Sequence, residues 1–294
     1  MMSTLIETVV ETLTGRTRVT VDETYRAIQV DRGEVVGILT PGTYRLPSRK
    51  DRLVLEWYEV SDLIFLSEYE QALFEKRPEV AAEQLIVFTT GESEMAVIER
   101  DGRIFTVLKP DTKMVVWADM GPWETTLIDI ADDPAVEAKL AKRLKRSTVT
   151  DAMLTVTVDE GKTALITIDG KLDRQLGPGV YGFWKSGRQI ETKLVDLRHQ
   201  TLDVVGQELL TKDRVTIRVN IAANYRVTDP TLAVSAVKDF ADVLYRTLQT
   251  VFRKALGAKT LDQILENKAT VDGEALKLVQ TDLAAIGVEV SDLT

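Results

Sequence analysis

The residue types that most often perform catalysis are few in this chain and stand apart in the sequence. Its 294 residues include a single histidine, His199, and no cysteine. Ser186, Ser235 and Ser291 lack the Gly-x-Ser-x-Gly spacing that holds a serine nucleophile on a strand-to-helix turn. An enzyme needs titratable groups gathered in one pocket. The sequence therefore predicts no catalytic residue and a protein that is not a peptidase or hydrolase.

The sequence also lacks the residue patterns that are usual for metal and cofactor sites. Without cysteine the chain has no thiolate ligand and forms no disulfide. Asp132 and Asp133 are adjacent carboxylates, but Pro134 follows them, and this order suits a helix start with an Asp cap and a Pro in the first turn. The segment 177–179, Gly-Pro-Gly, lacks the Lys-Ser/Thr of a phosphate-binding loop. We therefore expect no cofactor and no metal site.

Basic residues gather in one place, toward the end of a helix expected over residues 135–145. The five cations are Lys139, Lys142, Arg143, Lys145 and Arg146. Cations at a helix C-terminus interact favourably with the macrodipole, so a solvated helix face explains them without a ligand. The alternative is contact with an anionic surface, either a lipid headgroup layer or an acidic face of a neighbour. The formal net charge of −9 leaves no broad positive field, so nucleic acid is not an expected partner.

Three stretches, over residues 25–46, 95–117 and 163–184, repeat one pattern of Ala, Gly and Pro. The aligned trios are Ala27, Ala96 and Ala164; Gly33, Gly102 and Gly170; and Pro41, Pro110 and Pro178. Each copy closes with an Asp and an apolar residue, at 62–63, 129–130 and 196–197. The offset of roughly seventy residues is longer than the usual solenoid repeats. The matching offsets predict an internal triplication.

Each copy is predicted to be an antiparallel β-meander. Residues 164–168 alternate as in a half-buried strand, and Asp169-Gly170 then predicts a two-residue hairpin turn. The first copy has Asp31-Arg32-Gly33 instead, which predicts a turn one residue longer. Pro178-Gly179 predicts a type II turn into the third strand. The expected fold class is α+β, with three repeated meander units and short helices, the last unit continuing into an α/β domain.

Other elements follow from periodicity and from capping residues. They are a strand over 52–66, a helix over 67–82 broken at Pro78, strands over 201–205, 208–211 and 215–227, a helix over 240–256 ended by Gly257 as a left-handed cap, a capping box over 260–263, and a last helix ended at Gly287 before a strand over 288–290. The expected domains are an N-terminal segment (1–20), β repeat 1 (21–88), β repeat 2 (89–157) and a final domain (158–294).

The first residues, 1–13, are compatible with a short amphipathic helix that has Leu5, Val9 and Leu13 on one face. Packing on the protein or on a partner chain is favoured over a membrane anchor, because the polar face lacks the Lys and Arg that bind anionic lipid. The segment also lacks the basic start of a signal peptide. The sequence contains no run of 18 apolar residues, so no membrane-spanning helix is expected.

A series of motifs in the last third of the chain resembles the SPFH or Band 7 domain of stomatins, prohibitins and flotillins. The motifs are VDLRxQ (195–200), ELLTKD (208–213), VTIRVN (215–220), YRVTDP (225–230), LG (256–257), TLDQIL (260–265) and GVEV (287–290). The pattern GxLxxxLGPGxYxFW over 170–184 resembles the start of that domain. Within the family the chain is most similar to bacterial slipins that carry extra copies of this β unit, so the last domain (158–294) is expected to be of SPFH type.

The resemblance implies a non-enzymatic, oligomeric scaffold, because such proteins assemble into large rings or cages, often on membranes. The implied partners are copies of the chain itself through lateral contacts, with a membrane surface or membrane proteins as further partners. The expected location is cytoplasmic, with peripheral attachment to the inner face of the membrane as the open alternative. The competing interpretation is a soluble ligand- or partner-binding module without higher assembly.

Two departures from the family pattern affect these expectations. Stomatins have an N-terminal membrane hairpin that this sequence does not show. The family also continues from the final strand into a long heptad helix, and this sequence ends at Thr294. We therefore expect the 294-residue chain to be a monomer or small oligomer, and large closed particles to need that helix.

Overall fold

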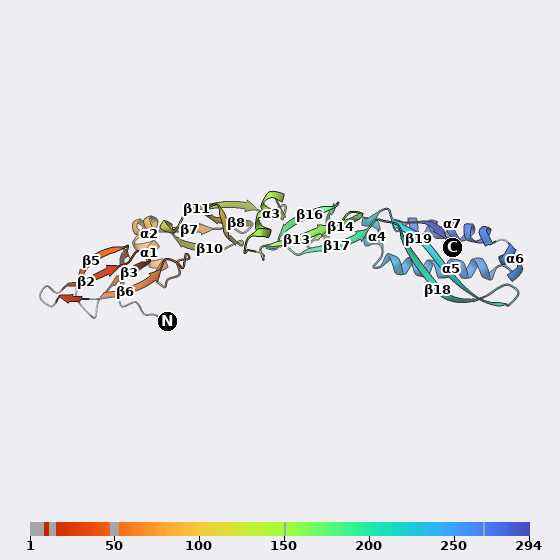
Figure 1. Ribbon diagram of the computed structural model, residues 1–294, viewed down its shortest axis with the longest axis horizontal. Coiled ribbons are helices and arrows are strands. Elements are labelled where there is room, and N and C mark those ends of the chain that lie inside the picture. Colours follow the sequence, from red (N-terminus) through yellow and green to blue (C-terminus); the bar gives the residue numbers. More distant parts are fainter. Residues whose placement is uncertain (1–8, 12–15, 48–52, 150, 267) are drawn as a thin grey trace. The chain divides into compact units, whose positions relative to one another are not determined.

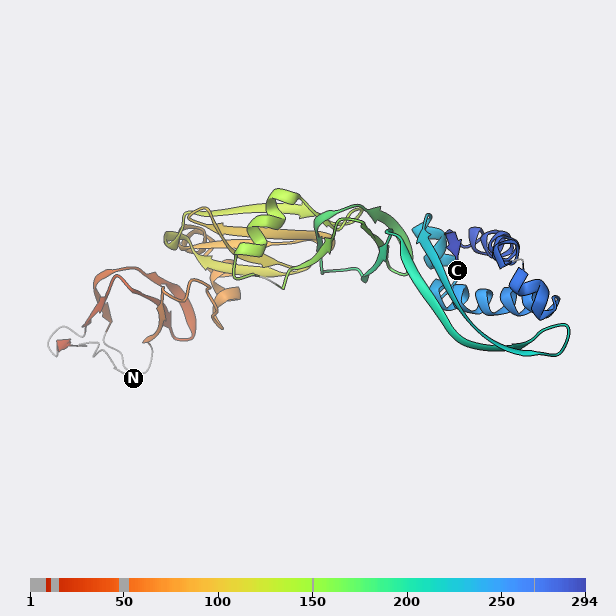
Figure 2. The same ribbon diagram turned by 45° about the vertical axis from the view of Figure 1, so that its right-hand side comes forward.

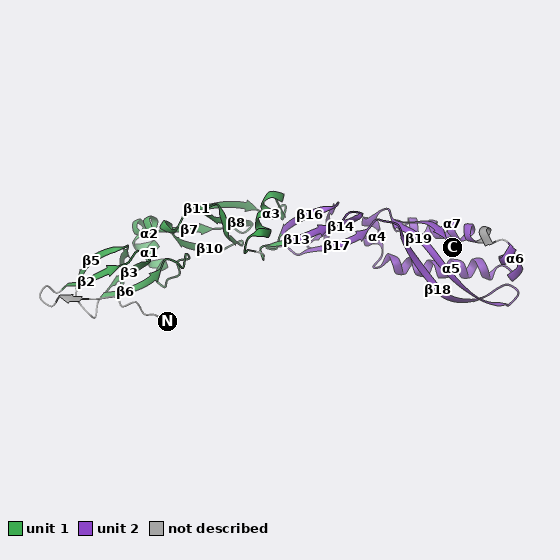
Figure 3. Ribbon diagram, viewed as in Figure 1, with its two compact units in different colours: residues 1–154, 184–187 green, residues 155–183, 188–294 purple. Residues whose placement is uncertain are grey.

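The computed structural model describes residues 9–11, 16–47, 53–149, 151–266 and 268–294 (Figure 1). Helices and antiparallel strands both contribute, so the fold is α+β as the sequence predicts. The chain divides into two compact units (Figure 3). Unit 1 comprises residues 1–154 and 184–187, and unit 2 comprises residues 155–183 and 188–294.

Unit 1 consists mainly of short antiparallel strands. They are β1 (Val9–Glu11), β2 (Arg16–Val21), β3 (Tyr25–Asp31), β4 (Glu34–Leu39), β5 (Gly42–Pro47), β6 (Leu53–Glu59), β7 (Leu85–Thr89), β8 (Glu94–Arg100), β9 (Arg103–Leu108), β10 (Lys113–Trp117), β11 (Trp123–Asp129) and β12 (Ala135–Val136). The helices are α1 (Glu70–Lys76), α2 (Pro78–Gln84), the 3-10 turn η1 (Ala118–Met120) and α3 (Ala138–Arg146). Sheets of the described residues have the orders β1-β2-β5, β4-β3-β6, β10-β7 and β11-β8-β9.

Unit 2 begins within β13 and combines antiparallel sheets with longer helices. Its strands are β13 (Met153–Val158), β14 (Lys162–Ile168), β15 (Lys171–Leu176), β16 (Gly179–Trp184), β17 (Ile190–Asp196), β18 (Gln200–Leu210), β19 (Thr216–Val227) and β20 (Val288–Leu293). Its helices are α4 (Pro230–Ala236), α5 (Phe240–Gly257), α6 (Leu261–Glu266) and α7 (Lys268–Ala284). The sheets have the orders β15-β14-β17 and β18-β19-β20.

The three predicted hairpin turns all have the same length. The partners Asp31 and Glu34 enclose Arg32-Gly33, just as the other two hairpins enclose Asp101-Gly102 and Asp169-Gly170. Both residues of each turn have positive φ, for example 55° at Arg32 and 80° at Gly33. The longer first turn expected from the sequence is therefore wrong, because Arg32 adopts the left-handed conformation that Asp has in the other copies.

The third strand of each predicted meander is not hydrogen-bonded to the second strand. Strand β5 pairs with β2, β10 pairs with β7, and β16 lies next to β13. The fourth strand of each copy (β6, β11 or β17) pairs instead with the first (β3, β8 or β14). The consecutive meander expected from the sequence is thus wrong in strand order. The proline that precedes each third strand has no N–H to donate, and the chain leaves the sheet there.

Several boundaries in unit 1 also differ from those expected. The strand over 52–66 ends at Glu59, because the chain turns at Val60–Asp62, where the Asp62 amide donates to the Glu59 carbonyl (3.1 Å). The helix expected from residue 135 begins at Ala138, because Ala135 and Val136 form β12. Asp133 accepts a hydrogen bond from the Ala135 amide (2.9 Å) in a turn that precedes the helix.

The N-terminal helix expected over residues 1–13 is wrong at Val9–Glu11, which form β1 and pair with β2. The β-branched pair Val9-Val10 suits a strand. The remaining residues of that expected helix lie outside the described ranges.

The core of unit 2 lies between the β18-β19-β20 sheet and helices α5 and α7, which Figure 2 shows beside the long β18–β19 hairpin. Leu244, Leu248 and Val279 have no exposed surface there. The two strands expected over 201–205 and 208–211 are the single strand β18, because a bulge between Val204 and Gln207 keeps both halves paired with β19.

Helix ends in unit 2 mostly follow the sequence. Asp229 caps α4 by accepting from the Leu232 amide (2.9 Å). The capping box over 260–263 is confirmed, since the Thr260 amide donates to the Gln263 side chain (3.0 Å) and the Gln263 amide donates to the Thr260 hydroxyl (3.4 Å). Gly257 is not a left-handed cap: it is the last residue of α5 itself.

Gly287 is a position at which a side chain would be strongly damaging. Its φ is +71°, and an added Cβ would lie 2.4 Å from the backbone oxygen of Asp229. Its own carbonyl accepts from the amides of Thr228 (2.9 Å) and Asp229 (3.1 Å), so the two segments cannot separate without breaking these bonds. Gly273 offers a matched control, because it lies in α7 and an added Cβ would meet nothing within 4 Å apart from its chain neighbours and the backbone of its own helix.

We predict that Gly287→Ala lowers the free energy of unfolding of unit 2 by about 2–4 kcal/mol, from the left-handed φ and the close contact together. The control Gly273→Ala should raise it by about 0.5–1 kcal/mol, because alanine is the better helix former. Urea unfolding followed by circular dichroism measures both. Shifts of the two variants in the same direction would contradict the strain assigned to Gly287.

Candidate functional site

Helix α3 carries the five predicted cations on one side and packs against unit 1 with the other. Its sequence, AKLAKRLKR, contains no acidic residue. Leu144 is 1% exposed, and Leu140 and Ala141 pack beside it on a core that includes Met95 and Trp184. Cations in the last turn also compensate the partial negative charge of the helix C-terminus. The helix is thus held by its apolar side, and its basic side faces outward.

Arg143 is bound within the protein rather than free for a ligand. Its guanidinium donates Nη1 to Glu99 Oε1 (2.9 Å), Nη2 to Glu99 Oε2 (2.5 Å) and Nη2 to the Gly102 carbonyl (3.3 Å). These bonds tie α3 to the β8–β9 hairpin. The hydrogen bonds from Arg143 hold the pKa of the Glu99 carboxyl below its usual range, and Glu99 in turn raises the pKa of Arg143.

The other four cations are exposed and form the surface that we call the basic face. They are Lys139, Lys142, Lys145 and Arg146. Within the described ranges, none of the four has an ion pair with a carboxylate of the chain. The sequence thus located the cluster, and contact of these residues with an anionic surface stays a prediction, now without Arg143.

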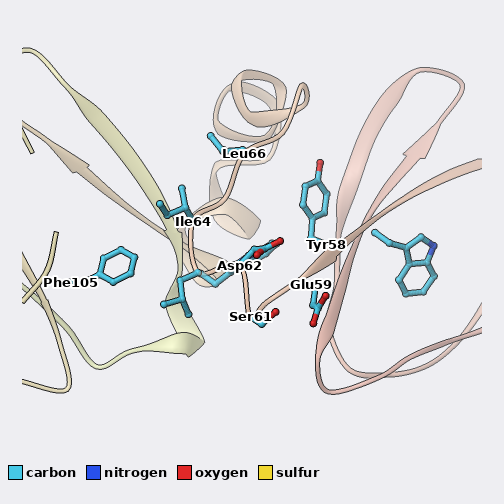
Figure 4. Close-up of a pocket in the computed structure, with 10 residues that line it drawn as sticks. Tyr58, Glu59, Ser61, Asp62, Ile64, Leu66 and Phe105 are labelled. Atoms are coloured by element: carbon cyan, nitrogen blue, oxygen red, sulfur yellow. The ribbon is translucent and has the colours of Figure 1, made fainter. Parts of the chain in front are cut away.

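A pocket of about 530 Å³ in unit 1 is a second candidate site (Figure 4). The end of β6 supplies Tyr58 and Glu59, and the following turn supplies Asp62. The chain then pairs with β10, where the Phe65 amide donates to the Val115 carbonyl (2.8 Å). We call this the acidic pocket, and its main lining residues are Tyr58, Glu59, Asp62, Ile64, Leu66 and Phe105.

The lining of the acidic pocket combines carboxylates with aromatic and aliphatic surface. Glu59 and Asp62 are exposed, and none of the described lining residues is basic. In Figure 4 Asp62 lies between the side formed by Ile64 and Phe105 and the side formed by Tyr58. Such a lining suits a cationic group with an apolar stem better than an anion.

Two polar atoms of β6 are buried close to this region. The Tyr58 hydroxyl and Glu56 Oε2 make no hydrogen bond of ordinary length, but Tyr58 lies near enough to Ser67 and Glu56 to interact with both side chains. Burial raises the pKa of Tyr58, the interaction with Ser67 lowers it in part, and the nearby Glu56 and Glu68 raise it again. The tyrosine therefore stays protonated. Sequence reasoning missed the pocket because it treated 52–66 as one strand; Ser61-Asp62 was the local turn signal.

The residues considered for catalysis lie apart. His199 is exposed in the loop between β17 and β18. The Ser291 hydroxyl donates to the Asn224 carbonyl (3.1 Å), and the Ser235 hydroxyl donates to the Leu232 carbonyl (3.4 Å). Over the described ranges, no three side chains of the types that bind metal ions form a group. Among the residues that the structure describes, no helix is long and apolar enough to cross a membrane.

Comparison with known proteins identifies the second half of the chain. Residues 156–294 match the model of the SPFH domain / Band 7 family. A stomatin homologue from Pyrococcus horikoshii is 31% identical over 134 residues, which is 46% of this chain and 50% of that protein. Mouse stomatin is 46% identical over 78 residues, which is 26% of this chain and 27% of that protein. The region from residue 156 to residue 294 therefore belongs to the SPFH domain / Band 7 family, as the sequence motifs predicted.

A further relative is mechanosensory protein 2 of Caenorhabditis elegans, 31% identical over 115 residues, or 39% of this chain and 23% of that protein. The chain spans about half the length of the archaeal relatives it matches. The family match covers residues 156–294, so the basic face and the acidic pocket, which lie within residues 57–146, must be interpreted from their own chemistry.

We predict that Glu99→Gln lowers the free energy of unfolding of unit 1 by about 1 kcal/mol at pH 7, because one partner, Arg143, is 40% exposed. The pKa of Glu99 is lowered in the folded state, so its contribution is present above the ordinary Glu value of about 4.3 and is lost as the pH falls through the folded value.

The difference between wild type and Glu99→Gln should therefore shrink when unfolding is measured at progressively lower pH, from 7 to about 2.5. Glu92→Gln is the matched control, since Glu92 is exposed and has no ion pair among the described residues. A difference that stays constant over this pH range would refute the assigned role of the Glu99–Arg143 pair.

Proposed function

We propose that this chain is a non-enzymatic subunit of an oligomeric scaffold of the stomatin and slipin type that organises membrane-associated assemblies. The observation that carries the proposal is the SPFH domain at residues 156–294. Relatives of this region include proteins named stomatin and stomatin homologue.

We further propose that residues 21–88 and 89–157 are additional copies of the β unit that opens the SPFH domain at residues 158–294, preceded by an N-terminal segment over 1–20. The support is the strand order. In each case the first strand of the copy (β3, β8 or β14) lies between the second and the fourth. A register shift also follows the same part of each first strand, at Gln29/Val30, Ile98/Glu99 and Ile166/Thr167.

In this proposal, copies of the chain associate laterally, at the cytoplasmic side of a membrane, and the basic face contacts an anionic surface. The support for the contact is the group of exposed cations on α3 that have no carboxylate partner within the described ranges. Nucleic acid is the less suitable polyanion, because four charges neutralise few phosphates and the net charge is −9.

The acidic pocket favours a second candidate function, a ligand- or partner-binding module without higher assembly. Its volume of about 530 Å³ lies within the range of small-molecule sites. The two functions differ in a simple observable, because a binding module stays monomeric at every concentration and a scaffold subunit does not.

We predict that the molar mass of the full chain, measured by size-exclusion chromatography with light scattering, rises with concentration between about 1 and 200 µM, since weak contacts saturate only at high concentration. The chain should also co-sediment with vesicles that contain about 30% phosphatidylserine more than with phosphatidylcholine vesicles, because cations near an anionic surface gain roughly 1 kcal/mol each. A chain that remains monomeric throughout, with and without vesicles, would remove the scaffold and leave the binding module.

A further inference from the structure

The basic face and the acidic pocket are complementary in charge and belong to different elements of unit 1. The basic face lies on α3, whereas the pocket is formed by the end of β6, the segment before α1, and strands β9 and β10. One surface presents four cations and the other presents Glu59 and Asp62, and neither has a counter-charge bound to it among the described residues. Each surface therefore presents charges without a counter-charge, and the other surface carries charges of the opposite sign.

The basic face can contact a partner only through its cations. Leu140, Ala141 and Leu144, the apolar side of α3, already pack within unit 1. The helix thus has no apolar stripe left to insert into a lipid layer or into a hydrophobic groove. What it offers is a set of long side chains with charged ends and aliphatic stems.

The acidic pocket has the features that bind such side chains. Leu66 and Ile64 are 76% and 40% exposed at its rim, and aliphatic stems of lysine or arginine cover surface of this kind. Phe105 and Tyr58 offer aromatic rings to a cation. The carboxylates of Glu59 and Asp62 accept charge-assisted hydrogen bonds from ammonium or guanidinium groups.

We propose that the acidic pocket of one chain receives lysine and arginine side chains from the basic face of a second copy. The inference rests on the proposed scaffold function and names one contact of that scaffold. Because the two surfaces differ, the contact is heterologous: each copy uses its pocket toward one neighbour and its α3 toward another, which lets the assembly grow into a ring or a filament.

Such a contact is weak and sensitive to salt. The ion pairs are exposed at the rim of the pocket, where screening acts over about 10 Å at 0.1 M salt and about 3 Å at 1 M. Charge steering raises the association rate more than the final affinity. Association should therefore appear at high protein concentration and weaken as salt is added.

The test is a charge exchange in the full chain. The pocket variant is Glu59→Lys with Asp62→Lys, and the helix variant is Lys142→Glu with Arg146→Glu; all four positions are exposed, so the fold tolerates the changes. Matched controls change the same charges at other exposed positions, Asp22→Lys with Glu34→Lys and Arg45→Glu with Lys109→Glu. Sedimentation velocity at 20 and 300 mM salt measures self-association.

We expect wild type and both controls to self-associate at low salt. Each double variant alone should have a dissociation constant at least tenfold higher. Mixing the pocket variant with the helix variant should restore association, because the exchanged charges match again across the contact. Wild-type-like association of either variant, or no recovery on mixing, overturns the pocket–helix contact.

Two further outcomes separate this inference from the proposals on which it rests. If wild type assembles and both variants assemble equally, the scaffold stands and this contact is wrong. If the helix variant loses binding to phosphatidylserine vesicles while self-association is unchanged, the basic face is a lipid site and the contact is again wrong. A wild-type chain that neither associates nor binds vesicles removes the scaffold function itself.

Discussion

Burial of one central strand from both sides is the constraint on which unit 1 depends most. In β3, Ala27 faces a core with Val19, Val21 and Leu46, whereas the next residue, Ile28, faces a different core with Phe65 and Trp117. Both residues have no exposed surface. A strand in this position must hydrogen-bond along both edges and present apolar side chains to both faces. That requirement explains why β4 and β6 flank β3, while β5 crosses to another sheet.

The same constraint explains which sequence predictions succeeded and which did not. Asp-Gly pairs and the capping box over 260–263 act within a few residues, so the sequence located them. The alternation predicted for residues 164–168 was wrong, because β14 is buried on both faces and its residues 163–166 are all buried in succession. The partner of each third strand was also wrong, since a proline marks where a strand ends but contains no information about which distant edge the next strand joins.

Similar reasoning applies to the candidate sites. The five cations of α3 lie close together in the sequence and were found without a structure. Even so, the role of Arg143 depends on Glu99, which is 44 residues away in the chain. The acidic pocket combines residues near 60 with Phe105 and Trp117, and no local pattern joins them. The start of α3 was misplaced for the same reason, because the Pro134 carbonyl accepts from the Trp184 amide (2.8 Å), a contact that spans fifty residues.

The position of β20 at the end of the described chain affects the order in which the two units can fold during synthesis. Strand β20 pairs with β19 through partners such as Val227 with Val288, so α4 to α7 must be made before that edge of β19 is covered. Among the described residues, by contrast, the cores of unit 1 include none beyond Trp184. During synthesis unit 1 is therefore complete before β20 has been made. Until then, one edge of the twelve-residue strand β19 has no partner. During that interval the open edge of β19 can pair with a foreign strand.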